Sequence, residues 1–470
     1  MEGFPYLESK ESIQSYLESV AGGEGVGLDD LRLATTLDNR DKLASFRAKF
    51  CLPTISDICE GEKLAADIDS SQDCVYLTGN SLGLQPKGTK DLIVADLDKW
   101  AKKGVYGHFH DPVAWLPIED IVVDESARLV GAKPIEVVPM NGLTVNCHLA
   151  MVSFYQPTKD RFKIVLEKDS FPSDFYAVQS QVNWHGYDPK EAMIVMAPRE
   201  GEHFWRTEDV VQLIEEQGDS VALVWLPGVH YLTGYVFDME AITKAAHSKG
   251  CYVGFDLAHA AGNVELCLHD WGVDVAAWCT YKYLNSGPGG IAGFFVHEKH
   301  AHNQQLPRLL GWWSHNRKTR FDMSNVLDLQ AGAAGFQLSN PPVLECLSLK
   351  ASLDVFADTS MRELTIKSRI LTGYLEMLIE HYLTKEKREN VAADSSKYMT
   401  IVTPSDPKRR GAQLSLQFSF PVKEVHHQLA SRGVVTDLRK DGHMRVAPAP
   451  LYNSFKDVWT FFKTLELTLK

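Results

Sequence analysis

Short apolar runs alternate with longer amphipathic segments through the middle of the chain. Such near-continuous apolar runs, separated by helical patterns, are typical of a mostly parallel sheet that is buried on both faces. The pattern therefore predicts an α/β fold whose ligand sites lie at the carboxyl ends of the strands. The runs are Glu136–Pro139, Lys163–Leu166, Ala192–Met196, Ala222–Leu226, Cys251–Phe255 and Val275–Thr280.

Both ends of the chain have a different pattern. Residues 8–50 place apolar and charged positions at helical spacing. The break Asn340-Pro341-Pro342 precedes a long helical stretch at about 343–386. The tail then predicts a polar loop at Lys387–Lys397, strands at Ser415–Ser419 and Met444–Ala447, and a helix at 423–432.

Three regions are expected from these changes of pattern. Residues 1–70 form an N-terminal helical segment that packs with the small domain. Residues 71–342 form a large ligand-binding domain with a mostly parallel sheet of the seven-stranded type, flanked by helices. Residues 343–470 form a smaller α+β C-terminal domain. A chain of 470 residues has ample length for such an arrangement.

The composition of the chain limits the kinds of binding partner that we expect. The net charge of −13 opposes binding to nucleic acid, so an anion site must be local and enclosed. The eight cysteines show no CxxC spacing, which favours free thiols in a reducing compartment. Met1–Pro5 does not resemble a secretion signal, and no run is long enough to span a bilayer. We expect a cytoplasmic protein with no membrane partner and no metal site.

The most specific chemical feature is a carboxylate and a lysine that each close an apolar run. Asp256 lies in Phe255-Asp256-Leu257-Ala258-His259, and Lys282 lies in Tyr281-Lys282-Tyr283. Alone, Asp256 is better explained as a helix cap and Lys282 as a solvated side chain. Together at strand ends they favour a pyridoxal-phosphate (PLP) site. There the acid pairs with the pyridine nitrogen, and the lysine is anchor and proton shuttle.

Gly287-x-Gly289-x-x-Ala292 formally matches a dinucleotide-binding fingerprint. A strand-like run, Ile291–Val296, follows it where the fingerprint requires a helix. We instead expect the glycines to allow a sharp turn after Lys282.

Asp256-x-x-His259 and Tyr281-Lys282, followed by Leu284-Asn285-x-Gly287-Pro288-Gly289-Gly290, resemble the kynureninase family of fold-type I PLP enzymes. The resemblance extends over roughly 75–455. It implies that Lys282 carries PLP, that Asp256 holds the pyridine nitrogen, and that Tyr281 and His259 line the phosphate and ring.

Further cofactor residues follow from the same resemblance. Leu143 and Thr144 match a phosphate-binding turn, although a helix cap by Thr144 explains the local pattern equally well. Phe171 would stack on the ring, with Ser173 and Asp174 beside it, in a segment that by itself predicts a turn and helix start. One position departs from the family, because Pro227 stands where relatives often carry a hydroxyl.

The substrate side also rests on the resemblance. Arg445 matches the arginine that binds the substrate carboxylate, although its pattern alone favours a surface arginine. Ser81 and His108 would contact the substrate, while a lone histidine is more often structural. Trp312, Trp313 and Asn340 match segments that reach across from a neighbouring subunit, with Trp312 and Asn340 also near the cofactor, which implies a homodimer. His108 with Asn340 implies a preference for the 3-hydroxy substrate.

The implied reaction is hydrolysis of the Cβ–Cγ bond of kynurenine or 3-hydroxykynurenine. It gives anthranilate or its 3-hydroxy analogue plus alanine, in tryptophan catabolism and NAD biosynthesis. Tyr281 is the candidate acid and base beside Lys282. An aminotransferase or a cysteine desulfurase of the same fold stays open, as does a non-catalytic binding module. A desulfurase needs an exposed reactive cysteine, and an aminotransferase would convert an added 2-oxo acid.

Overall fold

The computed structural model describes residues 3–59, 64–383 and 398–468. The loop predicted at Lys387–Lys397 lies outside these residues. The chain forms two compact units. The terminal unit comprises Met1–Lys87, Leu232–Val236 and Thr359–Lys470, and the central unit comprises Gly88–Tyr231 and Phe237–Asp358.

A seven-stranded sheet forms the middle of the central unit, in the order β2-β8-β7-β6-β5-β3-β4. Neighbours from β7 to β4 run parallel, and β8 runs against both β2 and β7. The predicted mostly parallel sheet is therefore confirmed, and each apolar run coincides with a strand. The strands are β2 (Val137–Pro139), β3 (Lys163–Glu167), β4 (Met193–Met196), β5 (Val221–Pro227), β6 (Tyr252–Asp256), β7 (Val275–Trp278) and β8 (Gly293–Val296).

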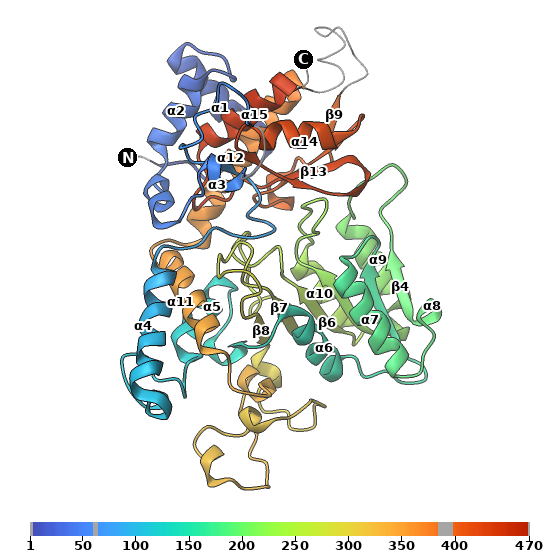
Figure 1. Ribbon diagram of the computed structural model, residues 1–470. Coiled ribbons are helices and arrows are strands. Elements are labelled where there is room, and N and C mark those ends of the chain that lie inside the picture. The colour runs from blue at the N-terminus through green and yellow to red at the C-terminus, as the bar shows by residue number, and fades with distance from the viewer. Residues whose placement is uncertain (1–2, 60–63, 384–397, 469–470) are drawn as a thin grey trace. The chain divides into compact units, whose positions relative to one another are not determined.

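Helices flank this sheet (Figure 1). Nearly every position of β5, β6, β7 and β8 is buried, as expected for a sheet covered on both faces. In the same unit, the gold-coloured segment between β8 and α11 extends away from the sheet (Figure 1). The helices are α4 (Gly88–Lys103), α5 (Asp120–Leu129), α6 (Leu143–Phe154), α7 (Pro172–Trp184), α8 (Pro189–Ala192), α9 (Thr207–Gln217), α10 (Met239–Ser248) and α11 (Val343–Ala357).

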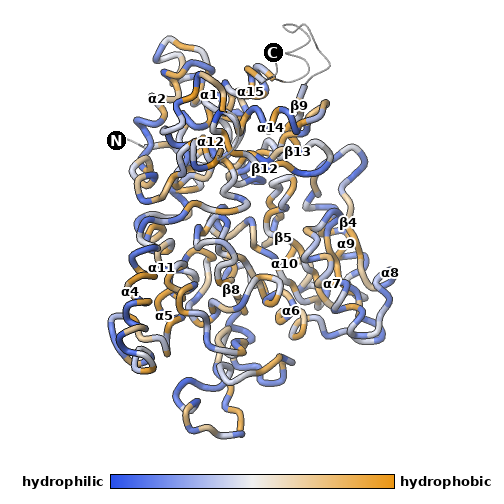
Figure 2. Tube along the Cα trace, in the orientation of Figure 1, coloured by the Kyte–Doolittle hydropathy of each residue, from blue (hydrophilic) through white to orange (hydrophobic). Residues whose placement is uncertain are grey.

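The helical stretch predicted at 343–386 is two helices, α11 and α12 (Met361–Tyr382). Ser360 separates the two helices, because its backbone is extended. Its hydroxyl accepts a hydrogen bond from the Glu363 N–H at 3.2 Å and so caps the start of α12. α11 is mainly hydrophobic (Figure 2) and packs against α4 and α5. It thus belongs to the central unit, whereas the sequence boundary at 342 assigned it to the small domain.

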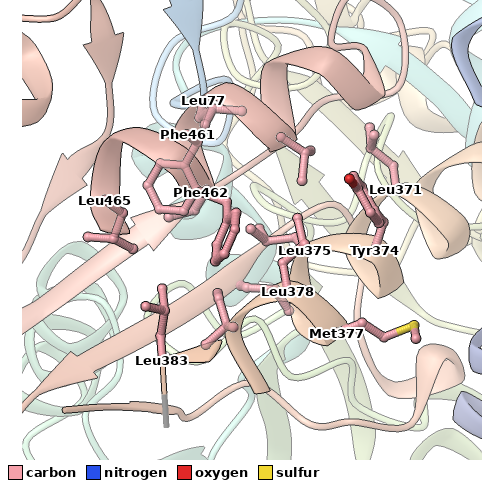
Figure 3. Close-up of a cluster of buried hydrophobic side chains, with 14 of the residues drawn as sticks. Leu77, Leu371, Tyr374, Leu375, Met377, Leu378, Leu383, Phe461, Phe462 and Leu465 are labelled. Carbon is pink, nitrogen blue, oxygen red and sulfur yellow. The ribbon is translucent and has the colours of Figure 1, made fainter. Parts of the chain in front are cut away.

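The terminal unit joins both ends of the chain. α1 packs against α12 and α2 against α15, around a core of leucine and aromatic side chains (Figure 3). An antiparallel sheet, β12-β13-β10-β9, and the parallel pair β1-β11 complete the unit. Its further elements are α1 (Lys10–Glu24), α2 (Leu31–Arg40), α3 (Ile55–Ile58), β1 (Val75–Tyr76), β9 (Met399–Ile401), β10 (Leu414–Phe418), α14 (Val422–Ala430), β11 (Val434–Val435), β12 (Asp437–Leu438), β13 (His443–Val446) and α15 (Phe455–Thr468).

Across the described ranges, no helix combines the length and the apolar composition needed to cross a membrane.

Candidate active site

A cavity of about 270 Å³ opens at the carboxyl ends of the parallel strands in the central unit. Glu167 ends β3, Pro227 ends β5 and Asp256 ends β6, and all three line the cavity. The first turn of α6 and the loop after β7 supply further walls. The site therefore lies where the strand pattern predicted it.

Lys282 lies in the loop between β7 and β8. Its Nζ is 3.1 Å from His259 Nε2 and 5.8 Å from the ring centroid of Phe171. Left-handed backbone at Asn285 (φ 51°), Gly287 (φ 93°) and Gly289 (φ 68°) turns the chain back into β8. The interpretation of these glycines as a turn is confirmed, and a strand rather than a helix follows them.

Asp174 and Asp256 form a hydrogen-bonded carboxyl pair in the cavity. Burial raises the pKa of both groups; the Asp256 carboxylate raises that of Asp174 further, while Lys282 counteracts the rise at Asp256. The hydrogen bond between them raises the pKa of Asp174 and lowers that of Asp256, so Asp174 is the donor and Asp256 the acceptor. Trp225 Nε1 donates to Asp174 Oδ1 at 3.3 Å, and the Ala258 N–H donates to Asp256 Oδ1 at 2.6 Å.

Glu167 and His230 are among the cavity residues that were not predicted from the sequence. Burial raises the pKa of Glu167 to about 8, with backbone and Ser170 hydrogen bonds working against the rise. Burial lowers the pKa of His230 to about 4, so its imidazole is neutral. Glu167 follows the Lys163–Leu166 run as Asp256 follows Cys251–Phe255, and that rule would have found it.

The first turn of α6 forms the other end of the cavity. Gly142 is its N-cap, so no side chain covers the N–H groups of Leu143 and Thr144. Thr144 lies inside the helix, and the interpretation of this residue as the helix cap is wrong. Its Oγ1 is 2.6 Å from Ser173 Oγ at the start of α7, which places two hydroxyls beside free N–H groups. Such a helix start favours an anion.

Four of the expected residues of the central unit lie outside the cavity lining. Trp312 is 48 % exposed, whereas Trp313 is buried with the Arg320 guanidinium 4.1 Å from its ring centroid. Asn340 is exposed, and the half-buried ring of His108 meets the ring of Trp115 edge-on at 5.4 Å.

Ser81 and Arg445 lie in the terminal unit. Arg445 lies on β13 and is 1 % exposed, so the alternative of a surface arginine is wrong. Its guanidinium forms an ion pair with Asp437 on the neighbouring strand β12. Ser81 is half-buried in the turn after β1, where its N–H donates to the Thr78 carbonyl at 2.9 Å.

Glu136, His269 and His297 offer three possible metal ligands within 4.8 Å of one another, on the sheet edge opposite the cavity. Glu136 already accepts hydrogen bonds from the backbone of Lys133 and Glu298, and from His269 Nδ1 at 2.9 Å. The two imidazole rings are stacked at 18°, so their lone pairs do not converge on one ion. We interpret this cluster as structural.

The chain is similar in sequence to proteins of a known family. Residues 123–408 match the model of the class-V aminotransferases, and residues 364–465 match that of the kynureninase C-terminal domain. A kynureninase from Nematostella vectensis is 51 % identical over 97 % of this chain and 97 % of its own length. One from Homo sapiens is 50 % identical over 93 % of this chain and 92 % of its own. The chain belongs to the kynureninase family.

Solved structures support the fold of this member of the kynureninase family. A cysteine desulfurase from Escherichia coli aligns with a TM-score of 0.69 at 18 % identity, covering 91 % of this chain and 98 % of its own. A cystine C–S lyase variant with glycine linked to its PLP aligns with a TM-score of 0.68 at 15 % identity, covering 83 % and 96 %.

The cavity of this kynureninase-family chain fits PLP. An amine, Lys282 Nζ, is available for an aldehyde, and the Asp256 carboxylate would accept from a protonated ring nitrogen. The half-exposed ring of Phe171 lies over the lysine amine and offers a stacking surface. The uncapped first turn of α6, with Thr144 and Ser173, suits a phosphate.

Proposed function

We propose that this chain is a PLP-dependent kynureninase. It hydrolyses the Cβ–Cγ bond of kynurenine and 3-hydroxykynurenine, releasing anthranilate or 3-hydroxyanthranilate together with alanine. Family membership over almost the full chain supports this, and the observation that carries it is one cavity containing Lys282, Asp256 and the α6 helix start. This reaction serves tryptophan catabolism and NAD biosynthesis.

When bound, PLP supplies an aldehyde that condenses with amines and a ring that accepts the electron pair from the substrate α-carbon. Lys282 would hold the cofactor, and the Nζ amine of Lys282 would take the α-proton of the bound substrate. The Asp256 carboxylate would favour the protonated ring nitrogen, while Asp174 donates a hydrogen bond to Asp256 and keeps that carboxylate oriented. Phe171 holds the ring plane in place.

Tyr281 is the proposed acid and base for adding water to the γ-carbonyl. Burial raises the pKa of its phenol, with Cys279 adding to the rise, so the hydroxyl is protonated at neutral pH. It can therefore donate to the carbonyl oxygen first and recover the proton when the bond breaks. Its ring centroid lies 5.9 Å from Lys282 Nζ, which keeps both proton-transferring groups at one end of the cavity.

The substrate carboxylate is assigned to Arg445, whose fork binds a planar carboxylate in two places. Ser81 is assigned to the same substrate. His108 and Asn340 are assigned to the aryl ring, and a preference for the 3-hydroxy substrate is proposed from this pair. Changing either residue should narrow the ratio of kcat/KM between 3-hydroxykynurenine and kynurenine, and an unchanged ratio would remove them from the specificity site.

A homodimer is proposed, in which Trp312, Trp313 and Asn340 complete the site of the neighbouring copy. Two groups of large apolar side chains exposed on the central unit support it, because exposed apolar surface is typical of a protein–protein interface. The exposed residues lie on α4 and the turn after it, and on the segment between β8 and α11. They are Val94, Leu97, Trp100, Val105, Tyr106, Phe109, Leu309, Leu310, Trp312, Phe321, Met323, Val326 and Leu327.

A cytoplasmic location is proposed from the cysteines. All eight are free thiols, which suits a reducing compartment. A desulfurase activity is not favoured by the cavity. Its lining contains Cys147, which is buried, and burial raises the pKa of that thiol well above its usual range.

The proposal is tested by adding 3-hydroxykynurenine to the PLP-loaded protein and following release of the aromatic acid. Lys282→Ala should abolish turnover and the absorbance of lysine-bound cofactor. Lys244→Ala, at an exposed lysine on α10, is the matched control and should behave as the wild type. Turnover of Lys282→Ala near the wild-type rate would overturn the proposal, and so would conversion of an added 2-oxo acid in place of hydrolysis.

A further inference from the structure

The turn that carries Lys282 contains buried hydroxyl groups that the proposed reaction does not use. Thr280 is 1 % exposed and Ser286 is 2 % exposed. Thr280 Oγ1 donates to the Ile291 carbonyl at 2.5 Å, and the two hydroxyl oxygens of Thr280 and Ser286 are 2.5 Å apart. A buried hydroxyl is costly unless it is hydrogen-bonded, so these contacts are part of what selects this turn.

The number of hydroxyl protons determines which group donates in each of these hydrogen bonds. Thr280 has a single hydroxyl proton, and the Ile291 carbonyl takes it. Ser286 Oγ must therefore be the donor in the bond to Thr280 Oγ1. The Ser286 N–H also donates to the Thr280 carbonyl at 3.1 Å, which closes the backbone around residues 281–285. Lys282 lies inside this closed segment.

A third hydroxyl ties the turn to a helix. Ser348 Oγ, on α11, donates to the Ser286 carbonyl at 2.6 Å. Ser348 lies between the buried Leu347 and Leu349, where a polar residue lowers helix stability and usually bonds within its own helix. Its bond instead crosses to the turn, and α11 is itself held by α4 and α5.

We propose that Thr280, Ser286 and Ser348 are positioning residues that fix the direction from which Lys282 Nζ reaches the cofactor and the substrate α-carbon. A lysine side chain is long and flexible, so the position and direction of its Cα–Cβ bond limit the directions from which Nζ can reach the cofactor. This turn also has left-handed residues at Asn285 and Gly287, so its backbone has alternatives that the hydroxyl bonds exclude. The inference rests on the proposed role of Lys282 as the cofactor lysine.

Two matched pairs of variants test this inference in the PLP-loaded enzyme. Ser348→Ala removes the bond from α11 to the turn. Ser352→Ala makes the same change one helical turn later, at a fully buried serine whose hydroxyl has no hydrogen-bond partner among the described residues. Thr280→Val removes the hydroxyl at similar volume, and Thr280→Ser restores it.

Ser348→Ala and Thr280→Val should lower kcat about 10-fold with KM nearly unchanged, because a small displacement of a reacting group is costly. They should also shift the pH midpoint of the absorbance of lysine-bound cofactor, a change that a loss of fold stability alone would not give. Ser352→Ala should match the wild type in both measurements, and Thr280→Ser should recover most of the loss.

The inference is overturned if Ser348→Ala and Ser352→Ala give the same kcat and the same absorbance titration. If Thr280→Val does not fold, the serine pair decides alone. A failure of the underlying function is distinguishable, because the wild type would then lack the absorbance that Lys282→Ala is expected to remove.

Discussion

The carboxyl groups of Asp174 and Asp256 share one hydrogen bond, with Asp174 as the donor. Two acids from different elements, the first turn of α7 and the end of β6, thus form one hydrogen-bonded unit in the cavity lining. Since Asp174 also accepts from Trp225 Nε1, its orientation is fixed independently of any ligand.

Asp256→Asn should weaken PLP binding roughly 10- to 100-fold, because a hydrogen bond to a charged group contributes about 1.5–3 kcal/mol. Asp174→Asn should cost far less, since its amide still donates to the Asp256 carboxylate. Equilibrium dialysis of PLP against both variants measures the difference. Equal losses in the two variants would contradict the assignment of donor and acceptor.

Glu167→Gln should make stability less dependent on pH. The pKa of Glu167 is raised to about 8, so between about pH 4.3 and 8 the folded state keeps a proton that the unfolded state has released. The free energy of unfolding contributed by this group therefore falls as pH rises through that window. Urea midpoints of the cofactor-free protein at pH 5, 6.5 and 8 should lie closer together in the variant than in the wild type. Glu215→Gln, at an exposed position on α9, should keep the wild-type slope.

Thr144→Val and Ser173→Ala should each weaken the affinity for PLP about 10-fold, with kcat at saturating PLP little changed. Both hydroxyls lie beside the uncapped N–H groups of α6, where a charge-assisted hydrogen bond to phosphate contributes about 1.5–3 kcal/mol. Ser180→Ala is the control, because this α7 hydroxyl donates to the Ala177 carbonyl away from the cavity. Loss of affinity in the control as large as in Ser173→Ala would refute the phosphate assignment.

Lys367→Met should lower the free energy of unfolding by about 3–5 kcal/mol. Lys367 Nζ lies 2.8 Å from Asp41 Oδ2 and 2.7 Å from the Pro450 carbonyl, and both charged side chains are 3 % exposed. The substitution leaves the Asp41 carboxylate buried without its cation. Adding Asp41→Asn should recover part of the loss in urea titrations, and a cost below 1 kcal/mol for Lys367→Met would show that the pair is not stabilising.

The sheet could be predicted closely because its strands are buried runs with clear ends. The very short strands, such as β1, β11 and β12, were not predicted, since two residues carry no periodicity. The division between α11 and α12 was missed because Ser360, a typical helix cap, lies between two strongly apolar segments.

The residues of the candidate site also divide into those that the sequence pattern predicts and those that depend on contacts formed in the fold. Asp256 and Lys282 could be found because each ends a run of buried residues, and Glu167 obeys the same rule but was overlooked. The burial of Arg445 could not be predicted, because it depends on Asp437 from a neighbouring strand of the small sheet. The environment of Trp313 likewise depends on Arg320, which lies in the next short turn of the same irregular segment, where no periodic pattern predicts a contact.

The terminal unit has a consequence for how the chain matures during synthesis. α1 and α2 are synthesised before the central unit, but they pack against α12 and α15, which are synthesised after it. The apolar faces of α1 and α2 therefore stay uncovered until nearly the whole chain has been synthesised. All strands of the central unit are synthesised much earlier. In a nascent chain stalled before α15, the central unit should be folded while α1 and α2 expose their apolar faces. Early termination should therefore lead to aggregation and to binding by chaperones.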